Sequence, residues 1–306
     1  MILSITKPQF EACIPSAIDP ESCLFVRVQP FIETADLMLH TGLLGDGLYM
    51  FLTDAFSPSS ETAPDGAPLS PATDFRQPAT LEMIASGVLH YIVNRAMVLA
   101  IPQLDLILTS SGFGVVSSSQ IAPASRDRVE NLRRSCDSAA HYWRDTLLLQ
   151  LLGNSATQPL AIASPEFVAA TSSLFWTEAQ ARAAIPEAHT GKTLDELRPL
   201  ISRAETEIAK RISREQLVTL FTKMRQSDLT SAQLQVVGML RSVAGALVAL
   251  PLDSPKAFAL RYLRNIYEVM EDYPDDFAEY HSSSVYAGRH APTYENRAQD
   301  PLFALL

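Results

Sequence analysis

Six histidines are the first residues of this chain to consider for metal binding or acid–base chemistry. They are His40, His90, His141, His189, His281 and His290. None stands in an HExxH pattern or in another spacing typical of metal ligands. His90 and His141 fall beside apolar residues of expected helices, where a histidine in or beside the core is the ordinary case. The sequence therefore predicts no metal site.

Three cysteines, Cys13, Cys23 and Cys136, are the candidate nucleophiles or disulfide partners. Their odd number and the lack of a CxxC spacing argue against a secreted disulfide framework and against a zinc knuckle. Cys136 falls on the apolar face of an expected helix, and no base can be assigned to it. We therefore expect a packed thiol in a reducing compartment.

Two further patterns have the residue types of a binding loop. Gly112-Phe113-Gly114 lacks the third glycine or the Gly-Lys-Ser/Thr of a phosphate loop. The acidic run from Glu268 to Glu279 is interrupted by Pro274 and lacks the alternating oxygen ligands of a calcium loop, so we interpret it as a solvated face or an interface rim. We predict no catalytic, cofactor-binding or metal-binding residue and expect that the protein is not an enzyme.

Composition limits the class of protein further. The chain has 306 residues, of which 47% are hydrophobic and 19% charged, and this composition excludes a disordered or fibrous protein. The net charge of -10 has the wrong sign for a protein that wraps nucleic acid with a basic face. The longest apolar stretches, such as Val243 to Leu252, are about half a membrane span, and the first residues do not resemble a signal peptide. We expect a soluble protein without a membrane or sequence-specific nucleic-acid partner.

The histidines and cysteines discussed above must be positioned by the fold. The clearest feature of the predicted fold is an internal repeat of helices. Phe25 to Leu52 matches Leu194 to Phe221 without a gap at an offset of 169 residues. Both windows carry apolar residues at helical spacing and then break, the first near Gly42 and Gly45 and the second at Ser213. Three identical pairs fall within six residues: Pro30 and Pro199, Ile32 and Ile201, and Ala35 and Ala204.

The repeat predicts the fold class: mainly α, with two duplicated helical-bundle halves and a projecting β-hairpin between them. Each half contains a helix, a short helix and a long helix that ends near a proline, Pro102 or Pro251. We expect the first helical repeat in residues 1–122, with a Pro-rich loop at 54–80 and the hairpin at 104–117. A long bridging helix that follows Ser125 occupies 123–160, the second repeat 161–272 and an irregular tail 273–306.

The hairpin is the candidate interaction site. Leu104 to Val116 alternates apolar residues around Ser110-Ser111-Gly112, which is typical of two strands joined by a tight turn. An apolar tip at Phe113, Val115 and Val116 suits insertion into a neighbouring subunit. The alternative is a hairpin that folds back on the core of its own chain.

Two stretches carry a resemblance to a known family. DLILTSSGFGVVSSSQIAPASRDRVENLR, from Asp105 to Arg133, and YLRNIYEVMEDYPDDFAEYHSSSVY, from Tyr262 to Tyr286, resemble an uncharacterised family of about this length that is encoded by phages and prophages of Bacteroidales. That family has no established activity, so the resemblance implies no catalytic residue. It implies a gene among phage structural genes, near those for the capsid and neck.

A helical bundle with an intervening hairpin is also similar in shape to the head-to-tail connector proteins of tailed phages, which form rings below the portal. The resulting hypothesis is a virion structural protein, a connector or neck adaptor that binds the portal, neck or tail proteins and neighbouring copies of itself. Its location would be the virion, after the host cytoplasm during assembly. The alternatives are a phage assembly or accessory protein absent from the particle, a tail or baseplate part, and an unrecognised enzyme.

Overall fold

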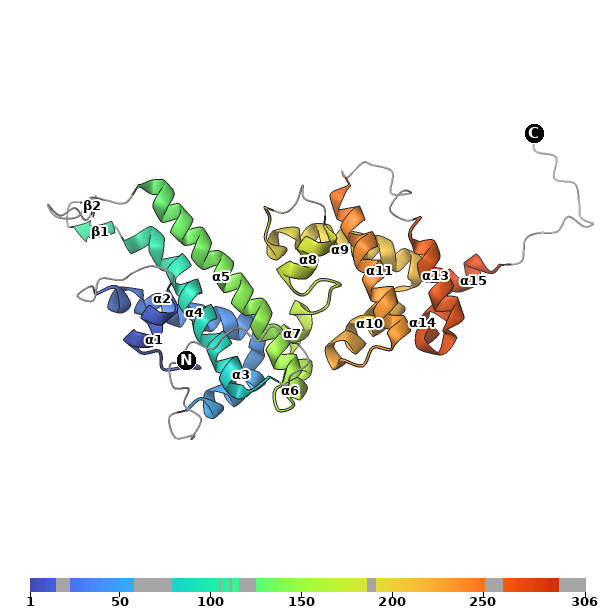
Figure 1. The fold of residues 1–306 in the computed structure, drawn as a ribbon, viewed down its shortest axis with the longest axis horizontal. Helices are drawn as coiled ribbons and strands as arrows, with labels where there is room; N and C mark the ends of the chain where they lie inside the picture. The colour runs from blue at the N-terminus through green and yellow to red at the C-terminus, as the bar shows by residue number, and fades with distance from the viewer. Residues whose placement is uncertain are drawn as a thin grey trace, which may run out of the picture. The chain divides into compact units, whose positions relative to one another are not determined.

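The computed structural model describes residues 1–14, 23–57, 79–104, 106–109, 112–115, 125–185, 191–250 and 261–291. It is mainly helical, as the sequence predicts (Figure 1). The chain divides into two compact units: unit 1 is Met1–Ala183 with Arg225–Ser227, and unit 2 is Ala184–Met224 with Asp228–Leu306.

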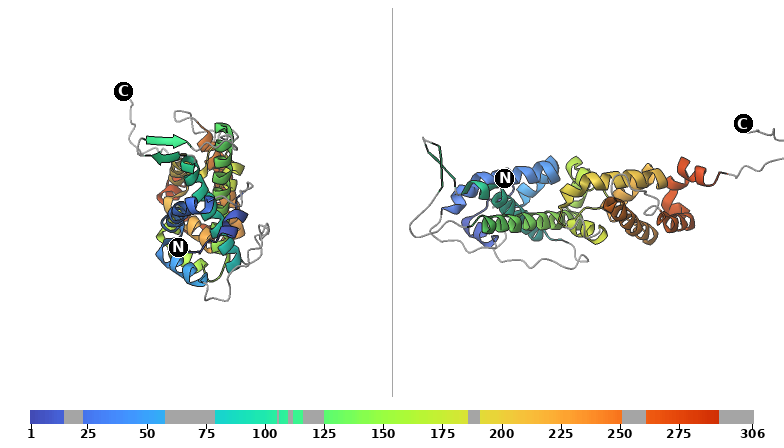
Figure 2. Two further views of the ribbon diagram at one scale, coloured as in Figure 1. Left: turned by 90° about the vertical axis from the view of Figure 1, so that its left-hand side faces the viewer. Right: turned by 90° about the horizontal axis from the view of Figure 1, so that it is seen from above.

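Unit 1 is built around one long apolar helix. Its elements are α1 (Lys7–Ala12), α2 (Leu24–Leu39), the π-helix η1 (His40–Leu44), α3 (Gly45–Ala55), α4 (Leu81–Leu104), β1 (Leu106–Thr109), β2 (Gly112–Val115), α5 (Arg126–Gly153), α6 (Gln158–Ala163), α7 (Pro165–Ala170) and all but the last residue of α8 (Glu178–Ala184). Helix α4 packs along α2 and along α5 (Figures 1 and 2). Because α4 has a neighbour on two sides, it is buried around most of its circumference.

Among the described residues, two helices pass a membrane-span test by length and composition: α4 of unit 1 and α11 (Ser231–Ala249) of unit 2. In α4, however, 72% of the apolar window is buried inside the protein, and in α11 56% of the window is buried. A core helix of a globular protein satisfies the same test, and the packing of α4 accounts for its apolar sequence.

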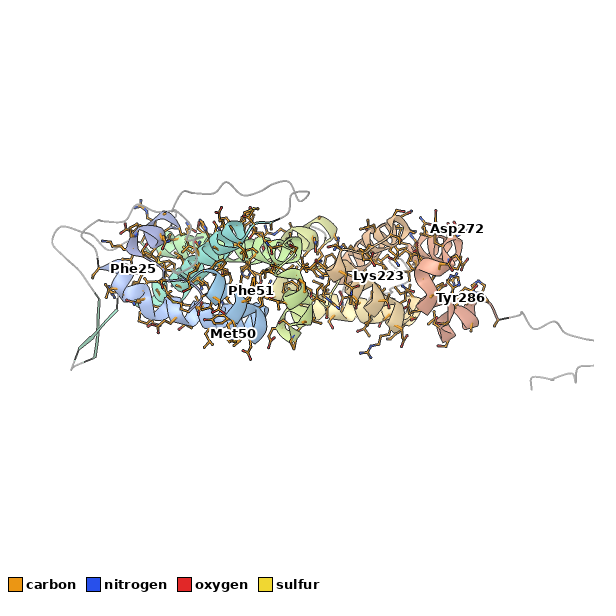
Figure 3. The ribbon with its side chains drawn as sticks, turned by 90° about the horizontal axis from the view of Figure 1, so that it is seen from below. Phe25, Met50, Phe51, Lys223, Asp272 and Tyr286 are labelled. Atoms are coloured by element: carbon orange, nitrogen blue, oxygen red, sulfur yellow. The ribbon has the colours of Figure 1, made fainter. Side chains whose placement is uncertain are left out.

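Unit 2 repeats the arrangement of a first helix packed on a long one. It contains α9 (Leu194–Ile212), α10 (Arg214–Gln226), α11, α13 (Leu263–Asp272), the 3-10 helix η3 (Pro274–Phe277), α14 (Ala278–His281) and α15 (Ser284–Arg289), drawn with side chains in Figure 3. Helix α11 packs against α9 and α13. Capping boxes at Thr193 and Thr230 begin α9 and α11.

In each unit a residue with positive φ separates two consecutive helices: Gly45 follows α2 and η1, and Ser213 follows α9. Gly45 has φ 67° and ψ 172°, and Ser213 has φ 78° and ψ 145°. Glycine adopts this conformation without penalty, whereas serine is strained in it. The Ser213 hydroxyl accepts a hydrogen bond from the backbone N–H of Gln216 and thereby caps α10. The two breaks lie 168 positions apart, since 213 − 45 = 168.

Several sequence predictions need correction. Helix α5 begins directly after Ser125 as predicted, and it lies within unit 1, where it packs along α4. The expected helix from Pro165 to Ala184 is interrupted between α7 and α8. Helix α4 continues through Pro102 to Leu104, because a proline in the last turn removes only one helical hydrogen bond.

The expected irregular tail is helical over much of its first part. Residues 274–289 form η3, α14 and α15. Phe277 and Tyr280 are fully buried, and the backbone N–H of Tyr280 donates to the side-chain oxygen of Gln216 over 3.0 Å. These aromatic anchors order a segment whose composition alone indicates a loop.

The two strands lie where the hairpin is predicted. β1 and β2 pair antiparallel, with Leu106 opposite Val115 and Leu108 opposite Phe113. The turn residues and the direction in which the hairpin projects fall outside the described residues, as does most of the 54–80 loop. Those parts of the prediction stay predictions.

Candidate functional site

His90 and Cys136, two of the residues considered in the sequence analysis, are packed against other parts of the fold. The His90 ring stacks on Trp143 with ring centres 4.2 Å apart, and its Nδ1 lies 2.8 Å from the carbonyl oxygen of Ser86. Cys136 is buried, and burial together with the charge of Asp137 raises the pKa of its thiol. The thiol is therefore held in its unreactive protonated form. His189 lies outside the described residues.

Two other histidines make polar contacts close to breaks or ends of helices. His40, the first residue of η1, has its Nε2 2.8 Å from the Asp46 carboxylate, and its ring stacks on Tyr49. His281 has its Nε2 2.8 Å from the carbonyl oxygen of Met270. The described residues contain no group of three or more His, Cys, Asp or Glu side chains that could hold a metal ion.

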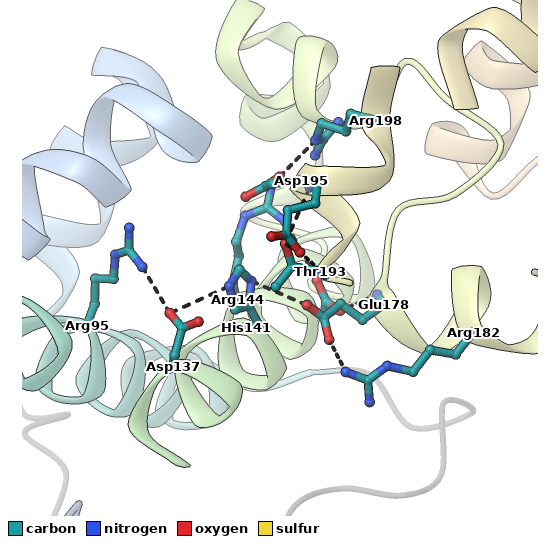
Figure 4. A network of polar contacts seen from close by, with 11 residues as sticks. Arg95, Asp137, His141, Arg144, Glu178, Arg182, Thr193, Asp195 and Arg198 are labelled. Carbon is teal, nitrogen blue, oxygen red and sulfur yellow. Dashed lines mark hydrogen bonds and ion pairs between the residues drawn. The ribbon is translucent and has the colours of Figure 1, made fainter. Parts of the chain in front are cut away.

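The largest group of charges in unit 1 connects three helices, and Figure 4 shows it from close by. Arg95 of α4 lies 3.2 Å from the carboxylate of Asp137, which lies 3.7 Å from His141. On its other side, His141 lies 3.6 Å from Glu178 of α8. We call Arg95, Asp137, His141 and Glu178, together with Asp145, the α5 charge cluster. Its polar contacts link α4, α5 and α8.

Asp145 is the most buried carboxylate of this cluster. One of its oxygens accepts a hydrogen bond from the backbone N–H of Glu178 over 2.6 Å, so Asp145 caps the amino-terminal end of α8 from another helix. Burial raises the pKa of Asp145 to about 6, although this hydrogen bond and the nearby Arg144 guanidinium oppose the rise. The cluster can therefore exchange a proton below neutral pH, but its geometry is that of a cap and a helix connector.

The pKa of Asp145 predicts a pH dependence of stability. An acid whose pKa is higher in the folded chain than its ordinary 3.8 stabilises folding when protonated, so this group costs unit 1 stability as pH rises from about 4 to about 6. The loss reaches about 3 kcal/mol for a two-unit shift. Asp145→Asn keeps an acceptor for the Glu178 N–H and removes the titration. Denaturant unfolding of both proteins from pH 4 to pH 7 should give free energies that diverge in favour of the variant as pH rises.

Asp127→Asn is the matched control, because Asp127 lies exposed on the same helix and loses the same charge. If the unfolding free energies of wild type and Asp145→Asn run parallel across this pH range, Asp145 is ionised throughout and the assignment of its pKa is wrong.

The predicted interface residues have a clear place in the backbone. Phe113 and Val115 belong to β2, whereas Val116 falls outside the described residues. Because successive residues of a strand alternate between the two faces of a sheet, the register places Leu106, Leu108, Phe113 and Val115 on one face. All four are apolar. Gly112 and Gly114 share the other face with Ile107 and Thr109.

The sequence analysis missed the α5 charge cluster, although one signal for it is visible. Asp137, His141 and Asp145 follow one another at intervals of four, which places them on one face of a helix. The partners Arg95 and Glu178 come from distant parts of the chain, and no local spacing indicates them.

Comparison with known proteins gives one match. No curated protein and no solved structure matches the chain significantly. The segment of the chain that matches a family model is residues 42–167. It begins in η1, includes α3, α4, α5 and α6, and ends in α7, so it lies entirely within unit 1. It covers less than half of the chain. Over residues 42–167 the sequence matches a family of unknown function, DUF6712.

Proposed function

We propose that the chain is a non-enzymatic virion component of a phage, a head-to-tail connector or neck adaptor that binds the portal and neighbouring subunits in a ring. The observation that carries the proposal is the antiparallel register of β1 and β2, from which alternation along each strand predicts one apolar face of the hairpin. A two-stranded hairpin has little stability alone in water, and it needs a surface against which to bury such a face. The residues Leu106, Leu108, Phe113 and Val115 supply that face.

The helical body supports the same role. The first helix, the break and the second helix recur in both units, and the burial pattern follows an offset of 169 up to Leu43 and Ile212. From Gly45 and Ser213 onward the pattern follows an offset of 168. One extra residue in η1 accounts for the change, since the wider i→i+5 turn of a π-helix accommodates an added residue. We infer that the units are duplicated copies.

The net charge suits a protein through which DNA passes better than one that binds DNA tightly. A net charge of -10 per chain gives a ring of many copies a strongly negative field. Such a field repels DNA from the channel wall and keeps it from adhering during passage.

Mass spectrometry of purified particles tests the proposal. A connector is retained at constant copy number in particles of the phage or prophage that encodes the chain. If the protein is abundant in the infected cell and absent from purified particles, it is an assembly or accessory protein instead.

The hairpin face gives a second test. Phe113→Asp combined with Val115→Asp should prevent assembly with the portal and with other copies, because burying two carboxylates in an apolar contact is costly. The helical signal and the melting temperature should stay nearly unchanged. Ile107→Asp combined with Thr109→Asp, on the opposite face of the hairpin, is the matched control. If the Phe113→Asp, Val115→Asp protein unfolds as a monomer, the hairpin belongs to its own core and the interface assignment is wrong.

A further inference from the structure

The first turns of α5 lack a buried side. Every residue from 125 to 135 is exposed or half-buried, and the first buried residue of the helix is Cys136. Val129 continues the apolar stripe of Cys136 and Ala140 at helical spacing, yet 38% of it is exposed. An apolar stripe that continues past its intramolecular cover is a helix face without a partner among the described residues.

Arginines lie on both sides of Val129 in the sequence. Arg133 and Arg134 both pair with Glu130, whereas exposed Arg126 and Arg128 have no ion-pair partner among the described residues. At 100° per residue, both arginines flank Val129 around the helix. Asp127 lies on the opposite side. We call Arg126, Arg128 and Val129 the basic tip.

Unit 2 carries a surface of the opposite character at the end of α13. Tyr273 is 54% exposed, and exposed Asp272 and Asp275 stand on either side of it in the sequence (Asp272 is labelled in Figure 3). We call these three residues the acidic tip. Within the described residues neither carboxylate has an ion-pair partner.

Three acidic residues near this tip in the sequence are already engaged. Glu268 pairs with Arg264 over 3.1 Å, Glu271 with Arg289 over 3.6 Å, and Asp276 accepts a hydrogen bond from the Thr230 hydroxyl over 2.8 Å. Glu268, Glu271 and Asp276 are therefore held by contacts within the chain. The carboxylates of Asp272 and Asp275 and the ring of Tyr273 are exposed to solvent.

We infer that the basic tip of one copy docks on the acidic tip of a second copy of this chain. Two guanidinium groups and a valine face two carboxylates and a tyrosine, so charge-assisted hydrogen bonds and a cation–π contact can form together. Because the two tips differ, the contact is heterologous, and such contacts close into rings when the rotation between copies permits it. The pairing deepens the proposed function and rests on it for the expectation of a closed ring.

Charge exchange tests the pairing. We expect the full-length wild type to form an assembly of several copies by light scattering, and the assembly to dissociate as NaCl rises, since salt screens exposed charges. Arg126→Glu with Arg128→Glu should weaken association at least about tenfold, and Asp272→Arg with Asp275→Arg should do the same. An equimolar mixture of the two variants should assemble again, because each supplies one surface complementary to the other.

Lys192→Glu with Arg214→Glu is the matched control, because it changes the net charge by the same amount as the arginine reversal at exposed positions that belong to neither tip. The mass of the assembly that this control variant forms should equal the mass of the wild-type assembly. The inference is overturned if the wild type is a monomer, if either reversal leaves the mass unchanged, or if the mixture stays monomeric. A protein retained in purified particles whose reversed variants still assemble refutes this contact and leaves the connector role standing.

Discussion

Alanine at Gly45 is expected to destabilise unit 1 by about 3 kcal/mol, because a side chain at this position is strained and crowded at once. The φ of 67° with ψ of 172° belongs to a region that is essentially restricted to glycine. A Cβ there would lie 2.6 Å from the hydroxyl oxygen of Ser164 and nearer still to a carboxylate oxygen of Glu166. Chemical denaturation followed by circular dichroism measures the loss.

The crowding has a second consequence for α7. The Ser164 hydroxyl accepts the hydrogen bond from the backbone N–H of Phe167 that caps this helix, so moving Ser164 away from a new Cβ weakens the cap. Gly47→Ala is the control on α3, because a Cβ at Gly47 meets nothing within 4 Å. Alanine is a better helix former than glycine, and Gly47→Ala should be neutral or stabilise by up to about 1 kcal/mol. Equal stabilities of the two variants would show that the backbone at Gly45 relaxes freely.

Local periodicity explains which parts of the fold are predictable from sequence. In α2 and α9 the predicted apolar stripes include Ile32 and Ile201, and both are buried, since burial along an amphipathic helix follows from spacing. The start of α5 after Ser125 and the end of α11 before Pro251 follow from single residues at helix termini.

Other features depend on contacts between residues far apart in sequence. Helices α14 and α15 form where Tyr280 is buried and bonded to Gln216, 64 positions earlier. The gap between α7 and α8 ends where Asp145 caps Glu178, and no pattern near residue 178 indicates that carboxylate. Half of the α5 charge cluster is visible as an i, i+4 spacing on one helix, but its partners require the tertiary fold.

Alanine at Gly245 is expected to destabilise unit 2 by about 3 kcal/mol or more, because the new Cβ would meet backbone. It would lie 2.6 Å from the carbonyl carbon of Ala184 and nearer still to its oxygen, and Ala184 belongs to unit 2 by its contacts. Backbone cannot rotate away as a side chain can, so α11 or the residue it packs on must shift by more than about 1 Å. The strain lowers the denaturant concentration at the unfolding midpoint. The backbone amides of buried Val243 and Ala244 should also become less protected from hydrogen exchange.

Gly238 provides the control within the same helix, because a Cβ there meets nothing within 4 Å. Both substitutions raise the helix propensity of α11 by the same amount, about 1 kcal/mol, so the difference between the two variants isolates the contact with Ala184. Gly238→Ala should therefore unfold at a slightly higher denaturant concentration than wild type, and Gly245→Ala at a much lower one. A Gly245→Ala protein as stable as Gly238→Ala would mean that α11 does not approach Ala184 this closely in solution.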